Sequence, residues 1–207
     1  RGQAVQAVLV LRGGSLQTFA GQAEALGLMA AMFDKGSKTL SRQQVSDRLD
    51  ALRTQVSFAV NPAEPGALRV AISSRREFLA AALELVGSLL REPRFDAAIL
   101  EELKRQAQAD IETARHEPEA ILDEALFRRL TPYARGDIRH VRSFEERLAD
   151  LKGVTPQGLA ALHQQVLGAS RVELAVVGDF EAPALKAAAH KALAGWPTAV
   201  AFEPVAM

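Results

Sequence analysis

The sequence contains no cysteine. This absence excludes disulfides, thiolate metal sites and a cysteine nucleophile, but it leaves the compartment open, because periplasmic and cytoplasmic proteins alike can do without cysteine. An excess of charge of one sign is also missing, since 25 basic side chains balance 25 acidic ones. We therefore expect neither a nucleic acid nor an anionic membrane surface as a partner.

Long hydrophobic runs are missing too, and none reaches the roughly 18 residues that a membrane-spanning helix needs. We therefore expect a soluble protein, periplasmic or cytoplasmic, with no membrane span. What the sequence does have is a hydrophobic fraction of 48% over 207 residues, which is typical of one folded domain with a sizeable core. It begins at Arg1 without a methionine or signal peptide and ends on an apolar segment, which predicts that residues 1–207 are a single domain cut from a longer protein.

Apolar and alternating runs predict four strands, at 4–12, 55–61, 67–73 and 171–179. Capping residues, among them Ser41, Asp96 and Thr155, and helical periodicity together predict eight helices. Their ranges are 20–33, 41–52, 78–90, 96–116, 118–130, 143–151, 155–167 and 183–193. Three strands come early, and the fourth must return to the same sheet after a long helical excursion. We therefore expect an α+β fold, a two-layer α/β sandwich in which helices pack on one face of a mixed or antiparallel sheet.

Candidate catalytic side chains are few. The four histidines are His116, His140, His163 and His190, and none has another histidine at helical i+3 or i+4 spacing. Catalytic zinc needs about three protein ligands that converge on one point, so we expect these to be surface or capping histidines. The pairs Glu101-Glu102 and Glu145-Glu146 lie on helices that also carry basic residues, which favours solvated, ion-paired faces over an acid/base pair.

Two glycine-containing segments follow strands. Gly13-Gly14-Ser15 lacks both the spacing of a dinucleotide fingerprint and the lysine of a phosphate-binding loop, so it predicts a turn. Gly178-Asp179 ends the last strand, and Asp179 is expected to cap the following helix. The residues by themselves therefore indicate an α+β domain without a visible active site.

The order of several landmarks is more informative than any one of them. They are Gly13-Gly14-Ser15 after a strand, Lys35-Gly36-Ser37 after an apolar helix, Leu-Asp-Ala-Leu at 49–52, Arg-Glu-Pro-Arg-Phe at 91–95, Thr-Pro-Tyr at 131–133, the leucine and threonine spacing of 148–159, and Val-Val-Gly-Asp at 176–179. In this order they resemble pitrilysin/insulinase-type zinc metallopeptidases, peptidase family M16. The resemblance spans nearly all of the chain and implies a half-domain of the mitochondrial processing peptidase type.

In that family the apolar helix carries an inverted zinc motif, His-x-x-Glu-His. The resemblance places Gly27 and Ala31 at the two histidine positions and Ala30 at the position of the catalytic glutamate. The third ligand would fall near Asp110 or Glu112, and a shift of one residue along the apolar helix brings in only apolar side chains. The resemblance therefore implies an inactive domain with no catalytic residue, no metal ligand and no cofactor of its own.

Such a domain would form part of a peptide-binding chamber, contact the peptide substrate and pack against a catalytic half. That half, on the same polypeptide or in a separate subunit, would carry the zinc. Two alternatives stay open. One is a purely structural or assembly subunit, related to processing-peptidase or respiratory-complex core proteins. The other is an enzyme with a relocated site that uses His116 or His140 with nearby carboxylates.

Overall fold

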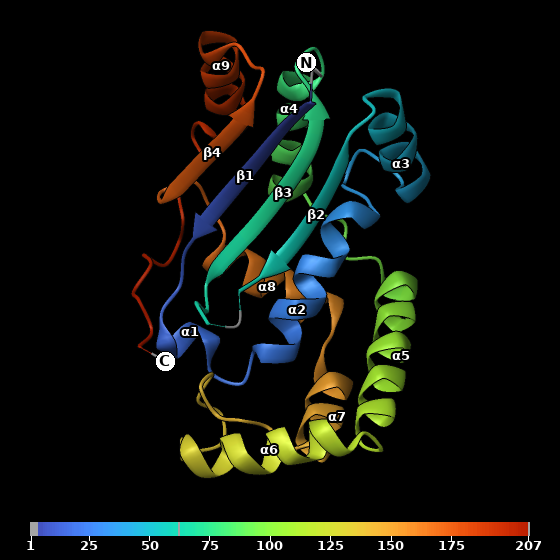
Figure 1. The fold of residues 1–207 in the computed structure, drawn as a ribbon, viewed down its shortest axis with the longest axis vertical. Helices are drawn as coiled ribbons and strands as arrows, with labels where there is room; N and C mark the ends of the chain where they lie inside the picture. The colour runs from blue at the N-terminus through green and yellow to red at the C-terminus, as the bar shows by residue number, and fades with distance from the viewer. Residues whose placement is uncertain (1–3, 62, 207) are drawn as a thin grey trace.

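A computed structural model describes residues 4–61 and 63–206. Its strands are β1 (Ala4–Arg12), β2 (Gln55–Val60), β3 (Ala67–Arg75) and β4 (Val172–Gly178), which form one sheet in the order β2-β3-β1-β4 (Figure 1). Every pairing among these strands is antiparallel, so the mixed sheet that the sequence left open is not formed. The fourth strand returns to the same sheet, as expected, and it pairs with the first.

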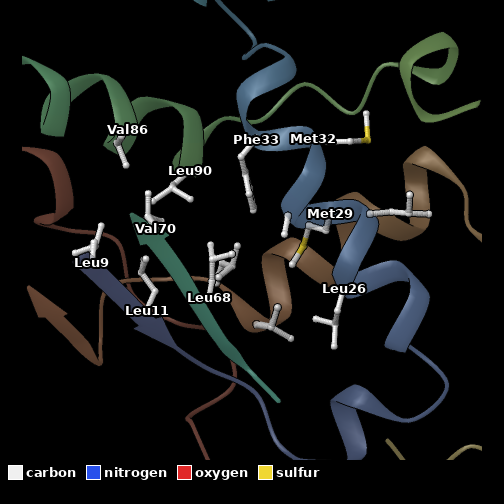
Figure 2. Close-up of a cluster of buried hydrophobic side chains, with 14 of the residues drawn as sticks. Leu9, Leu11, Leu26, Met29, Met32, Phe33, Leu68, Val70, Val86 and Leu90 are labelled. Carbon is white, nitrogen blue, oxygen red and sulfur yellow. The ribbon is translucent and has the colours of Figure 1, made fainter. Parts of the chain in front are cut away.

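Helices cover one face of the sheet, which confirms the two-layer sandwich. Along β1, the alternate residues Val5, Ala7, Leu9 and Leu11 are buried, while the residues between them are half-buried or exposed. Figure 2 shows side chains of β1 and β3 turned toward two helices, α2 (Ala23–Met32) and α4 (Leu79–Arg91). The core therefore lies between the sheet and this helical layer.

The apolar helix α2 is shorter at its start than the sequence predicts. A separate turn of helix, α1 (Leu16–Phe19), comes first, and Gly21 has a φ of 68°, which no α-helix accommodates. The end of α2 is where it was expected. The 3₁₀ turn η1 (Phe33–Lys35) continues the helix, and Gly36, with a φ of 134°, stops it.

Several helix starts are fixed by the caps that the sequence predicts. The remaining helices are α3 (Arg42–Ala51), α5 (Ala97–Ala114), α6 (Pro118–Leu130), α7 (Phe144–Gly153), α8 (Pro156–Val166) and α9 (Ala182–Leu193). The side chains of Ser41, Asp96 and Thr155 accept backbone N–H bonds at the starts of α3, α5 and α8. The expectation for Asp179 is wrong, because its carboxylate accepts from Arg76 at 2.8 Å while Glu181 occupies the N-cap position of α9.

Part of the helical excursion between β3 and β4, from α5 to α7, extends beyond the end of the sheet (Figure 1). In it, α5 contacts both α2 and α7, whereas α6 has no buried residue. Among the described helices, none combines the length and the apolar character that crossing a bilayer would require.

Candidate functional site

The positions where the resemblance expects zinc ligands lie on α2 in three different environments. Gly27 is exposed, and a Cβ added to it would meet no atom within 4 Å. Ala31, one turn later, is half-buried, and Ala30 is only 3% exposed. None of these residues has a side-chain atom that can bind a metal or carry a proton.

The helix that would carry the third ligand does lie beside α2, because α5 contacts it. Asp110 on α5 is exposed and accepts a hydrogen bond from Gln106, at 2.8 Å. Glu112 is half-buried and pairs with Arg115, at 3.0 Å. Within residues 4–61 and 63–206, no three His, Cys, Asp or Glu side chains are grouped so as to hold a metal ion.

The four histidines lie apart. His116 and His190 are exposed. The ring of His140 lies between the Tyr133 carbonyl oxygen, at 2.9 Å, and Glu146 Oε2, at 3.0 Å. His163 contradicts the expected surface or capping role: it is 7% exposed, and its Nε2 donates to the Leu90 carbonyl oxygen at 2.6 Å.

Burial of His163 follows from the side chains around it. Its ring lies about 6 Å from the rings of Phe33 and Phe95 and stacks on Trp196. Desolvation lowers the pKa of His163 below its usual value, although the bond to the Leu90 carbonyl acts in the opposite direction. His163 is therefore a neutral core residue that links α8 to the end of α4.

The glutamate pairs form ion-paired helix faces, as expected. Glu101 pairs with Lys104 at 3.0 Å, and Glu102 pairs with Arg42 at 3.3 Å. Glu145 pairs with Arg115 at 3.2 Å.

Glu146 is less solvated than its neighbour, with a side chain 18% exposed. A hydrogen bond from the backbone N–H of Ser143 lowers its pKa, and a bond to His140 lowers it further. This carboxylate serves as the reciprocal cap of α7, and its low pKa suits a structural role better than that of a proton donor.

The feature that the sequence analysis missed is an apolar surface on α6. Leu122, Leu126 and Leu130 are between 46% and 65% exposed, and their spacing of four places them in one line along the helix. Ile121 and Phe127 are each 48% exposed on the same helix. The sequence predicts the helix, but its apolar residues look like those of any buried face, so no local signal shows that the domain leaves them uncovered.

Comparison with known proteins identifies the fold. No family model and no curated protein matches the sequence. The structure is similar to that of a peptidase M16 inactive domain from Pseudomonas fluorescens, with a TM-score of 0.76 and 22% identity, over 99% of this chain and 49% of that chain. A protease from Helicobacter pylori gives a TM-score of 0.75 and 12% identity, and the match covers 96% of this chain and 46% of that chain. The periplasmic protease PqqL from Escherichia coli gives a TM-score of 0.72 and 15% identity, and the match covers 99% of this chain and 22% of that chain. The chain thus has the fold of an M16 peptidase inactive domain and spans about half, or about a fifth, of the chains it matches.

Proposed function

We propose that this chain is a non-catalytic domain of an M16-type zinc metalloendopeptidase, which helps to form a peptide-binding chamber and packs against the catalytic half. One observation carries the proposal: a domain with this fold has Gly27, Ala30 and Ala31 on the helix that bears the zinc motif in the resembling family. Losing both imidazoles and the glutamate removes the metal, the activated water and the proton carrier together.

The proposed partner is a catalytic half that carries zinc, on the same polypeptide or in a separate subunit. The matched chains are about twice as long as this one, or longer, which leaves room in such proteins for a further domain. The exposed leucines of α6, Leu122, Leu126 and Leu130, support a packing role, because contiguous exposed apolar patches mark contact surfaces.

Metal analysis and a peptidase assay on the purified chain test the catalytic part of the proposal. We expect zinc well below one equivalent and no peptide hydrolysis, and we expect hydrolysis once a half that carries His-x-x-Glu-His is added. Stoichiometric zinc together with activity that a chelator abolishes would overturn the proposal. In that case His116→Ala and His140→Ala would identify a relocated site.

Co-purification of the chain with that half, with and without a peptide substrate, tests the partner. We expect a complex whose stability increases with peptide, because both halves would contact it. A complex that forms equally well in both conditions would instead indicate a structural or assembly subunit.

A further inference from the structure

A small pocket lies where the end of α4, helix α8 and the segment after α9 meet. Its volume is about 250 Å³, and its walls include Arg91 on α4, His163 on α8, Lys38 and Trp196. We propose that this pocket binds a small organic carboxylate, whose charge pairs with Arg91 and Lys38 and whose apolar part packs beside Trp196. The inference goes beyond the proposed function and does not depend on it.

The guanidinium group of Arg91 is held in place by two contacts. Its Nη2 donates to the carbonyl oxygen of Ala194, and its Cζ lies over the Trp196 ring, 5.6 Å from the ring centroid. The Nε of Arg91 is buried, yet it has no hydrogen-bond partner among the described residues. Because a buried donor without an acceptor is unfavourable, this N–H is available to an acceptor that enters the pocket.

The charges around the pocket favour an anion. The nearby cation Arg94 is already paired with Asp96, at 3.4 Å. By contrast, no carboxylate within residues 4–61 and 63–206 forms an ion pair with Lys38 or Arg91, both of which line the pocket. Glu92 is the acidic residue of the lining, and it is exposed. Two positive charges against one negative charge therefore favour a ligand with a single negative charge.

The apolar part of the lining determines what the rest of the ligand is. Phe95, Leu167 and Pro197 contribute apolar surface. The wall that contains Trp196 is fixed, because its carbonyl oxygen accepts from the Ala169 N–H at 2.7 Å. The volume lies just below the range of roughly 300–1,000 Å³ that ligand pockets have, which favours a compact molecule over a peptide segment. The ligand class is therefore a carboxylate with a compact apolar body, and inorganic phosphate, which has no apolar part, fits less well.

Trp196 makes the binding directly measurable, because it is the one tryptophan of the chain and lines the pocket. Titration of the purified chain with 4-methylpentanoate should change the tryptophan fluorescence saturably, with a Kd of about 1 mM or below. The uncharged analogue 4-methylpentanamide and inorganic phosphate should each bind at least about tenfold more weakly, because one lacks the charge and the other lacks the apolar body.

Substitutions of the cations test the charge pairing. Arg91→Lys keeps the charge but removes the Nε–H and the planar group, so it should weaken binding by about tenfold. Lys38→Gln should weaken it by about threefold or more. Lys186→Gln is the matched control, because Lys186 is also an exposed lysine but does not line this pocket, and this variant should bind as the wild type does.

A second pair of variants tests whether the ligand occupies the pocket. Ala160 on α8 lines it, so Ala160→Leu fills the space and should weaken binding by about tenfold or more. Ala161→Leu is the control, because Ala161 is exposed and lies outside the pocket.

Circular dichroism checks that each variant is folded, and Lys38→Gln remains informative even if Arg91→Lys is not, because Lys38 is exposed. Absence of a saturable change, equal binding of the amide or of phosphate, or undiminished binding by Lys38→Gln or Ala160→Leu would each overturn the inference. The assay measures neither zinc nor peptide hydrolysis, so its failure is distinguishable from a failure of the proposed function.

Discussion

The resemblance places Ala30 at the position of the family's catalytic glutamate, and in the structure Ala30 belongs to the packed core. It is 3% exposed, so a carboxylate placed there would lose most of its hydration. We expect Ala30→Glu to lower the free energy of unfolding by about 2–4 kcal/mol, measured by urea denaturation. Gly27→Glu is the control and should stay within about 0.5 kcal/mol of Gly27→Ala, because the Gly27 position is open. Equal stability of Ala30→Glu and the wild type would show that the position is not packed.

His163 gives the domain a predictable response to acid. Burial lowers its pKa in the folded state, so the unfolded chain takes up a proton near the ordinary value of 6.5 while the folded chain still resists it. The contribution of the neutral His163 ring to the free energy of unfolding is therefore fully present above this value. It is lost as the pH falls from 6.5 toward the lowered pKa of the folded state.

Urea denaturation at about pH 7.5 and about pH 5.5 measures this loss against a His163→Phe variant. The variant keeps the aromatic packing but leaves the Leu90 carbonyl unpaired, so it should be about 1–3 kcal/mol less stable at the higher pH. It should also lose less stability than the wild type on acidification. The same loss in both proteins would assign the acid response to other groups.

At the scale of elements, the sequence predicts what local chemistry determines. The strands and the caps Ser41, Asp96 and Thr155 were predicted because strand alternation and N-capping depend on neighbouring residues. Asp179 was wrongly predicted to cap α9, because its carboxylate accepts a hydrogen bond from Arg76, which is distant in sequence. The early break before α2 went unnoticed because the residues around Gly21 are otherwise compatible with a helix.

The candidate surfaces could not be predicted in the same way. Whether Leu126 on α6 is covered depends on what the rest of the chain packs against, and the same apolar spacing describes a core helix. The burial of His163 depends on Phe33, Phe95 and Trp196, which come from three separate segments. Long-range packing decided each of these features, whereas the proposed loss of the zinc site rests on the residue types at the positions that the family resemblance marks.

α6 offers an element-scale test of the packing role. Leu122 and Leu126 are each about half exposed or more. We therefore expect the Leu122→Gln/Leu126→Gln variant to change the free energy of unfolding by less than about 1 kcal/mol. Association with the catalytic half should weaken by at least about tenfold, measured by titration calorimetry. Glu119→Gln, exposed on the same helix, is the control. Undiminished association of the double variant would mean that α6 is not the contact.

At the scale of the whole molecule, α6 lies beyond one end of the sheet and α9 near the other end of the long axis (Figure 1). α9 packs closely on α4, where a Cβ added to Gly87 would lie 2.7 Å from the Cβ of Ala192. We expect Gly87→Ala to lower the free energy of unfolding by about 1–3 kcal/mol in urea denaturation, because this contact has no room for a methyl group. Features this far apart without shared partners are expected to act additively. Gly87→Ala should therefore keep full affinity for the catalytic half, and a variant that also carries Leu122→Gln/Leu126→Gln should show the stability loss of the one and the affinity loss of the other. If Gly87→Ala weakens the association by more than about twofold, the two ends of the domain are coupled.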